Sequence, residues 1–314
     1  MSNFVSVVMP CYNAGRYLCE GMRSVLEQTH RDLELIVVDS GSSDDSWQVI
    51  QSFTGDERVR PLRLERSDVL NAAATRNRGL NAARGQYVKF VDADDLLHRE
   101  MVQKQFERME GRNDCVASSE WGRFYNDDLS TYHPNRQSVW RDMDAREWLV
   151  ESWMDARPMT QCGMFLIPRV LLDRVGGWDE KLTLIDDFEF FARVLCAANE
   201  VLFTPDCPMH YRSGLAGSLS GTKSDIAIES AFLSASMGVD HLLAKRADAR
   251  AKRACANIMQ DFVYTFYPAR PDLREKAEKR VRELGGADIA PGGGGKFHLA
   301  RRFIGWKLAR RLTS

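Results

Sequence analysis

Residues 87–95, which read YVKFVDADD, constrain the fold of this chain more than any other stretch. A short apolar run typical of a buried strand ends abruptly in three carboxylates, Asp92, Asp94 and Asp95. Unpaired charges are costly in a core, so this cluster must lie at a sheet edge or in a crevice. Mg²⁺ and Mn²⁺ prefer oxygen ligands and commonly bridge carboxylates to substrate phosphates. Taken alone, the stretch predicts either a site for a metal–diphosphate complex or a solvated turn with a helix cap.

The first third of the chain alternates between strand and helix patterns. Apolar, β-rich runs predict strands at 4–9, 33–38, 59–64 and 87–91, with Pro10 ending the first. Apolar residues at helical spacing between these runs predict helices near 14–27, 43–53 and 72–83. This alternation predicts an α/β fold, with a Rossmann-like, mostly parallel sheet and helices on both faces.

Beyond residue 113 the regular alternation is lost. We expect strands at 115–125, 160–167, 201–203 and 209–212, a polar loop after 125, and helices at 141–156, 170–175 and 186–198. From about residue 224 the chain is predicted to form a helical C-terminal extension, with a Pro/Gly break at 291–295. We therefore divide the chain at 1–113, 114–221 and 222–314.

Charge and cysteine content restrict the partners and the compartment. The formal net charge of −1 gives no reason to expect a nucleic-acid partner, but residues 221–314 carry +8 and the remainder −9. The seven cysteines show no CxxC pair or zinc spacing, which favours a reducing compartment. There is no signal-peptide pattern and no run of 18 apolar residues. We expect a cytoplasmic protein that reaches the inner face of a membrane through 296–314, unless that basic, aromatic stretch packs on the protein itself.

Polar clusters follow three of the predicted parallel strands, at 10–15, 39–44 and 92–95. In doubly wound sheets, ligands bind at the carboxyl ends of the strands, so the three clusters predict a shared nucleotide pocket. The glycine fingerprint of dinucleotide-binding dehydrogenases and the phosphate-binding P-loop are both missing. The Gly-rich, basic first loop of sugar-phosphate nucleotidyltransferases is missing as well.

At this point the chain resembles the family-2 inverting glycosyltransferases of the GT-A fold. The resemblance covers roughly residues 5–221. It is carried by VSVVMPCYNAGRYL, VVDSGSSDDS, AAATRNRGLNAARGQYVKFVDADD and GGWDEKLTLIDDFEFFARV, followed by HYR. It implies that 1–113 binds a nucleotide-sugar donor, and that 114–221 is the acceptor-binding and catalytic half of the same domain. A glycan, a lipid-linked molecule or a small molecule would be the acceptor.

The resemblance also assigns roles to single residues. Asp39 would contact the nucleotide base, Asp92 the ribose, and Asp94 a divalent metal, Mn²⁺ or Mg²⁺, on the donor diphosphate. Asp187, with Asp186 beside it, would be the catalytic base. Ser40 stands where the family usually has a second Asp, which leaves the base open, although uridine is the family habit. The expected donor-binding residues are Pro10, Tyr12, Asn13, Asp39, Ser40, Arg76, Asp92 and Arg212.

These residue types suit an inverting transfer, which needs a base on the acceptor hydroxyl and charge neutralisation on the departing diphosphate. Each of these features also occurs in proteins without catalytic activity. Acids in the first turn of a helix, such as Asp186 and Asp187, are favoured by the macrodipole alone. Arg212 would either reach the diphosphate or be a surface cation, and Trp121 and Trp178 would either stack on sugars or lie in the core. A non-catalytic homologue that binds a nucleotide sugar or a glycan is the alternative function.

Overall fold

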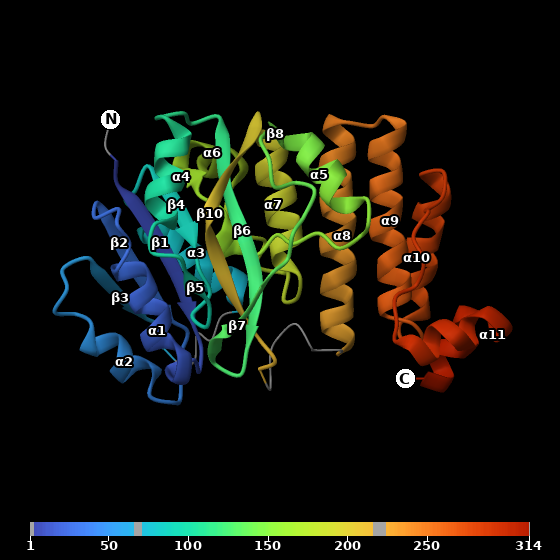
Figure 1. Cartoon of the computed structure of the whole chain (residues 1–314), viewed down its shortest axis with the longest axis horizontal. Helices are drawn as coiled ribbons and strands as arrows, with labels where there is room; N and C mark the ends of the chain where they lie inside the picture. Colours follow the sequence, from blue (N-terminus) through green and yellow to red (C-terminus); the bar gives the residue numbers. More distant parts are fainter. Residues whose placement is uncertain (1–2, 66–70, 216–223, 314) are drawn as a thin grey trace.

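The computed structural model describes residues 3–65, 71–215 and 224–313. Two sheets and their helices occupy one end of the molecule, and the helices that follow residue 224 extend toward the other end (Figure 1). The predicted division at 113/114 falls between α4 (Met101–Met109), a helix that the sequence did not predict, and β6 (Cys115–Tyr125). The division at 221/222 and residue 314 lie outside the described residues.

The first sheet has the strand order β3-β2-β1-β4-β9. Its first four strands are parallel, and β9 runs antiparallel to β4. Along the sequence, β2 and β3 are added on one side of β1, and β4 is added on its other side. Because such crossovers are right-handed, α1 and α2 lie on one face of the sheet and α3 lies on the opposite face. The elements are β1 (Val5–Cys11), α1 (Gly15–Leu26), β2 (Leu33–Asp39), α2 (Ser46–Ser52), β3 (Val59–Arg63), α3 (Ala72–Ala82), β4 (Tyr87–Phe90) and β9 (Ile167–Pro168).

The centre of this sheet is the core of the domain. All seven residues of β2 are buried, as expected of a strand covered on both faces, and Glu34 within it is paired with Arg60 and Arg84. The prediction that Pro10 ends the first strand was wrong, because β1 pairs with β2 as far as Cys11. Pro10 is tolerated there because β4 pairs with β1 only up to Val8, which leaves β1 a single neighbour at Pro10.

The second sheet is built around β10 (Glu200–Ser213), a strand longer than the sequence suggests. The two short strands predicted in this region are one strand whose pairing register shifts between Thr204 and Met209, where Pro205 and Pro208 interrupt the ladder. β10 runs parallel to β6 and antiparallel to β5 (Leu96–Leu97) and β8 (Met143–Asp144).

Two further predictions in this half need correction. The polar loop expected after residue 125 is a hairpin, in which β7 (Asp128–Pro134) returns antiparallel to β6. Asn126 and Asp127 both have a φ of 57°, the left-handed conformation that a tight hairpin turn requires, so the Asn-Asp pair carried the signal. The strand expected at 160–167 is instead a 3₁₀ turn (Cys162–Met164) followed by β9, with single bridge pairing between Ala117 and Leu166.

Helices complete the chain, as expected from about residue 224. The helix α8 packs between α7 and α9, with Ile228, Ala231 and Val239 buried. Length and mean hydropathy alone would let α8, of the described helices, cross a membrane, but packing on two sides accounts for its apolar character. The helices are α5 (Ala145–Trp153), α6 (Arg169–Val175), α7 (Asp186–Ala197), α8 (Asp225–Lys245), α9 (Ala249–Thr265), α10 (Pro271–Glu283) and α11 (Gly295–Thr313). The predicted fold class, a mostly parallel sheet with helices on both faces and a helical C-terminal extension, is confirmed.

Candidate active site

The carboxyl ends of β1, β2 and β4 lie at one edge of the first sheet, because the three strands are parallel neighbours. After β4 the Val91 N–H donates a last hydrogen bond to the Val8 carbonyl at 3.0 Å, and the chain leaves the sheet to carry Asp92, Asp94 and Asp95. The prediction that the three polar clusters share one edge is therefore confirmed.

Side chains join the loops that follow β1 and β2. The Asn13 N–H donates to Ser42 Oγ at 2.9 Å, and Asn13 Oδ1 accepts from the Ser43 N–H at 2.8 Å. Asn13 has a φ of 49°, which asparagine tolerates better than most residues. The Gly15 N–H, at the start of α1, donates to Asp44 Oδ2 at 3.0 Å. These bonds fix the two loops against each other, beside the edge where a nucleotide would bind.

The expected nucleotide contacts lie on these loops. Asp39 is fully buried, and its Oδ1 accepts a hydrogen bond from the Ser42 N–H at 3.1 Å. Its Oδ2 has no hydrogen-bond donor and lies 3.6 Å from Arg63 Nε. Ser40 is buried beside Asp39, whereas Tyr12 is exposed and Pro10 is half-buried in β1. One oxygen of this buried carboxylate is thus left without a hydrogen-bond donor from the protein, and its contact with a nucleotide base remains a prediction.

Arg76 on α3 connects segments that are far apart in the sequence. Its two terminal nitrogens donate to Asp92 Oδ1 and to Asp186 Oδ2, each at 2.8 Å. The guanidinium lies over the ring of Trp178, 4.5 Å from the centroid, and Trp178 in turn stacks on Phe190 of α7. Arg76 therefore holds the end of β4 and the start of α7 together. It lies beside the predicted donor site, and its contact with the donor remains a prediction.

Asp186 and Asp187 open α7, and neighbouring elements fix that end of the helix. Ile185, just before it, is left-handed with a φ of 59°, and its carbonyl accepts a hydrogen bond from Ser234 Oγ of α8 at 2.6 Å. The apolar side of α7 is buried, as predicted, with Phe190, Phe191 and Val194 all inaccessible. Asp187 is consequently held by a rigid helix and keeps little freedom of its own.

Burial and mutual repulsion raise the pKa values of several carboxyls in this cluster. Burial, and then the charge of Asp186, raises the pKa of Asp187 to about 7, against the opposing effect of Arg76. Burial, and then the charge of Asp92, raises the pKa of Asp94 to about 6. The pKa of Asp95 is raised well above its usual range, first by burial and then by Asp94. The site holds more negative charge than its arginines neutralise, an arrangement suited to a cation or a proton acceptor.

Gln161 is a site residue that no pattern in the sequence indicates. Its Nε2 donates to Asp92 Oδ2 at 3.1 Å and to Asp95 Oδ2 at 2.5 Å. Its Oε1 accepts from the Gly163 N–H at 2.5 Å, which fixes the orientation of the amide. A single glutamine in a stretch predicted to be a strand carries no motif, and only the fold brings it next to the acidic cluster.

Arg212, at the end of β10, is not the surface cation that the sequence left open, because its side chain is only 1% exposed. The guanidinium lies between the rings of Tyr17 and Phe124, with both ring centroids 4.7 Å away. It donates to Glu20, to Asp127 and to the carbonyl of Asp94 at 2.6–2.8 Å. Arg212 therefore supports the backbone of the acidic cluster, and direct contact with a diphosphate remains a prediction.

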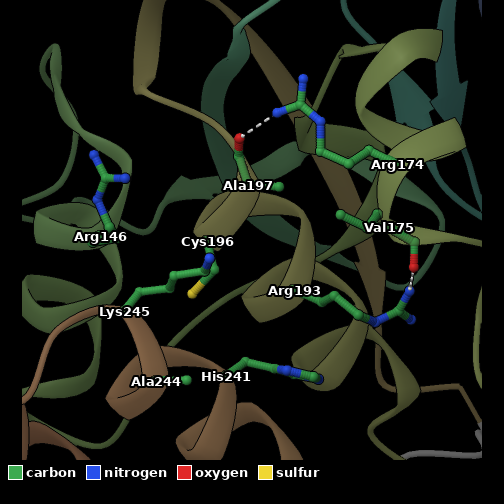
Figure 2. Close-up of a pocket in the computed structure, with 9 residues that line it drawn as sticks. All are labelled: Arg146, Arg174, Val175, Arg193, Cys196, Ala197, His241, Ala244 and Lys245. Atoms are coloured by element: carbon green, nitrogen blue, oxygen red, sulfur yellow. Dashed lines mark hydrogen bonds between the residues drawn. The ribbon is translucent and has the colours of Figure 1, made fainter.

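The two tryptophans considered for sugar stacking, Trp121 and Trp178, are both buried and belong to the core. The structure also contains a cavity of about 450 Å³ at the opposite end of α7. In Figure 2 Arg174 and Arg193 reach from its wall to the carbonyls of Ala197 and Val175. These cations complete the carboxyl ends of α6 and α7, so the cavity is part of the support of α7, and none of the acidic residues described above lines it.

Comparison with known proteins decides the family. A family model described as "Glycosyl transferase family 2" matches residues 6–176, which is more than half of the chain. The chain belongs to glycosyl transferase family 2. The acidic edge of the sheet, Arg76 and the short helix α6 all lie within the matched residues or at their border, whereas α7 follows them. The site of this family-2 glycosyltransferase is thus completed by a helix beyond the matched segment.

Relatives extend the similarity beyond that segment. Glycosyltransferase GlyG of Streptococcus pneumoniae is 29% identical over 234 residues, which are 72% of this chain and 76% of GlyG. An uncharacterized glycosyltransferase of Methanocaldococcus jannaschii is 28% identical over 202 residues, 63% of this chain and 66% of that protein. Among solved structures, S. aureus TarS 1-349 in complex with UDP-GlcNAc superposes with a TM-score of 0.69 at 17% identity, covering 89% of this chain and 80% of that chain. That likeness shows that the fold is shared.

Proposed function

We propose that this family-2 enzyme is an inverting glycosyltransferase with a GT-A fold. It would transfer a hexosyl or related sugar from a nucleotide sugar to a glycan, lipid-linked or small acceptor. The observation that carries the proposal is the position of Asp187: a carboxyl with a pKa of about 7, fixed at the start of α7, next to the carboxyl edge of the parallel sheet. A base whose pKa lies near the working pH is effective in proton transfer.

The donor is proposed to be a UDP-sugar. TarS, whose fold this chain shares, has been solved with UDP and with UDP-GlcNAc. In this chain the buried carboxylate of Asp39 has one oxygen without a hydrogen-bond donor, which supports a contact with an N–H of the base. Ser40 next to it is a second hydrogen-bonding group in the same loop. The donor therefore occupies the loops after β1 and β2 in this proposal, with its diphosphate toward Asp92 and Asp94.

The reaction is a direct displacement in this proposal. The acceptor hydroxyl oxygen forms a bond with the anomeric carbon while the bond between that carbon and the diphosphate oxygen breaks. Asp187 accepts the hydroxyl proton, and the nucleoside diphosphate leaves with the bonding electrons. Arg76 binds Asp186 and Asp92 at once, which keeps the base and the donor side of the site in register. No second nucleophilic carboxylate is needed, in contrast to retaining glycosidases.

Asp94 is proposed to bind a divalent metal, Mn²⁺ or Mg²⁺, together with the donor. The donor set fits, because burial and Asp92 leave the Asp94 carboxylate without full charge compensation. The described residues contain no group of three or more His, Cys, Asp or Glu side chains placed to enclose a metal by themselves. Phosphate oxygens and water would supply the other ligands, as is usual for Mg²⁺. When bound, the metal would neutralise charge on the departing diphosphate.

Asp94→Asn should abolish the Mn²⁺-dependent part of nucleotide binding. The substitution keeps the size of the side chain and removes its charge, so calorimetry with UDP should show no gain in affinity on adding Mn²⁺. Stability should not fall. The raised pKa means that the stability contributed by Asp94 is present below its unfolded pKa and is lost as pH rises through about 6, so a neutral amide is at least as stable near neutrality. A variant that binds UDP and Mn²⁺ like the parent would refute the role of Asp94.

The pH dependence of transfer follows from Asp187. The base must be deprotonated, so kcat/KM should fall about tenfold for each pH unit below about 7 and level off above it. The measurement is kcat/KM for release of nucleoside diphosphate in the presence of an active acceptor. A profile that stays flat down to about pH 5 would show that no carboxyl with a raised pKa acts as the base.

The alternative is a non-catalytic homologue that binds a nucleotide sugar or a glycan. The presence of Asp92, Asp94 and Asp187 in one site favours the enzyme. Incubating the protein with UDP-GlcNAc and other nucleotide sugars plus Mn²⁺, without acceptor, and measuring release of UDP would separate the two. Slow metal-dependent hydrolysis that disappears in Asp187→Asn supports the enzyme, whereas binding without any turnover, with or without acceptors, supports the alternative.

A further inference from the structure

The last helix, α11, is divided into two short helices. Gly305 has a φ of 73° and a ψ of 160°, so residues 295–304 and 306–313 form separate helical pieces. The second piece contacts α9 through Trp306 on Tyr264 and α10 through Lys307 on Glu278, and α11 lies at the end of the molecule far from the sheets (Figure 1). The attachment is specific: Phe297 and Ala309 are buried, and Trp306 packs edge-on against Tyr264 and Tyr267 with centroids 4.9 and 5.0 Å apart.

Both pieces of α11 expose large apolar side chains. Leu299 and Phe303 in the first piece are 62% and 80% exposed, and Leu308 and Leu312 in the second are 47% and 68% exposed. Each piece therefore presents a pair of large apolar side chains at i, i+4 spacing. These four are among the most exposed large apolar residues of the described chain, and solvent exposure of this kind marks an interaction surface.

The break at Gly305 explains how both pairs reach solvent. Leu299 and Leu308 are nine residues apart, so in a continuous helix, which turns about 100° per residue, they would point in opposite directions. One pair would then face α9 and α10. For the same reason, the apolar and basic residues of 295–313 are mixed on the helical wheel of an uninterrupted helix. The break at Gly305 rotates the second piece relative to the first, so that both apolar pairs are exposed.

The charge of α11 identifies the kind of partner. It contains six Lys and Arg residues and no Asp or Glu, and Lys296, Arg302, Lys307 and Arg311 are exposed beside the apolar pairs. A second copy of this chain would bring the same cations against this face, and like charges would oppose that contact. An anionic bilayer surface offers both an apolar layer for the leucine and phenylalanine side chains and negative charge for the flanking cations.

We propose that the two pieces of α11 dock the protein on an anionic lipid membrane. Leu299, Phe303, Leu308 and Leu312 enter the headgroup region, and the exposed lysines and arginines contact lipid phosphates. The buried side of α11 fastens the docked helices to the protein through Trp306 on Tyr264 and Tyr267, and Phe297 under Arg310 joins the first piece to the second. The structure thus accommodates both alternatives left open by the sequence, since one side of α11 packs on the protein and the other faces solvent.

The test is co-sedimentation with vesicles of phosphatidylcholine, with and without phosphatidylglycerol. The parent should sediment with the anionic vesicles and stay in solution with neutral ones, and added salt should weaken binding. Leu299→Ser with Phe303→Ser, and separately Leu308→Ser with Leu312→Ser, should each lower the bound fraction at least about fivefold. Substitution is preferred to truncation because removing 296–314 would also expose Tyr264 and Tyr267, the partners of Trp306.

Matched controls are available on other surfaces. Leu129→Ser on β7 together with Ile226→Ser on α8 removes two exposed apolar residues and should leave vesicle binding unchanged. Hydrolysis of soluble donor should be the same in all variants, so failure of docking and failure of the proposed enzyme activity give different results. Equal binding to neutral vesicles, no binding by the parent, or full binding by both double variants would overturn the proposal. A concentration-dependent dimer that only the double variants lose would assign this face to a second copy instead.

Discussion

Asp187→Asn should slow sugar transfer by about 10²–10⁴-fold while leaving donor binding intact. The amide has the size of the carboxyl and can keep the hydrogen bond that Asp187 Oδ1 accepts from the Phe188 N–H at 2.9 Å, but it cannot accept a proton. The helix should keep its position, because Phe190 and Phe191 anchor it in the core and the Ile185 carbonyl is bonded to Ser234. The measurements are single-turnover transfer and calorimetric binding of UDP with Mn²⁺.

Two controls separate loss of the base from general damage. Asp173→Asn, on the surface of α6, removes an exposed carboxylate that pairs with Arg169 and should leave transfer unchanged. Asp186→Asn should lower transfer less than Asp187→Asn, since Asp186 acts through Arg76 and does not take the proton in this proposal. Near-normal transfer by Asp187→Asn combined with a collapse in Asp186→Asn would move the base to Asp186.

The sequence was sufficient for the parallel half because strand, helix and turn patterns there are local. Mostly apolar, β-rich runs, such as that of β2, identify buried parallel strands, and the order of parallel strands then places the polar clusters at one edge. The irregular half depends on pairing between distant segments. Local patterns predict two short strands, 201–203 and 209–212, and only the long pairing of β10 with β6 shows that they are one strand.

The site was predictable to a similar extent. The acidic residues at 92–95 and 186–187 stand out in the sequence, since the first cluster follows an apolar strand pattern and the second begins an apolar helix pattern. Their counter-ions do not. Arg76 is one of several arginines in the α3 region. Nothing local indicates that it binds both Asp92 and Asp186, because Asp186 lies 110 residues from Arg76 in the sequence. Gln161 and the aromatic rings around Arg212 are likewise brought in by tertiary packing, which intrinsic propensities do not report.

Arg76→Met is expected to have the largest effect on stability. Arg76 is a buried cation between two carboxylates, and removing one member of a buried charge network typically costs about 3–5 kcal/mol because the others are left uncompensated. Asp92 is partly open to solvent, which places the expected loss in the free energy of unfolding at the lower end, about 3 kcal/mol. Arg78→Met, an exposed arginine on the same helix, should change it by less than about 0.5 kcal/mol. Urea unfolding measures both.

The effect of Arg76→Met should grow with pH, and the sign follows from linkage. Arg76 opposes the rise in the pKa of Asp186 and of Asp187, so without it both values rise further. Carboxyls with raised pKa values contribute stability that is present below their unfolded pKa and is lost as pH rises through the folded value. The variant should therefore differ least from the parent near pH 4 and most above about pH 7. Adding Asp186→Asn to Arg76→Met should recover part of the lost stability, because one of the two carboxylates is no longer charged. If the double variant is less stable than Arg76→Met at high pH, the lost stability does not come from an uncompensated Asp186 charge, and Arg76 does not hold the site together by neutralising that carboxylate.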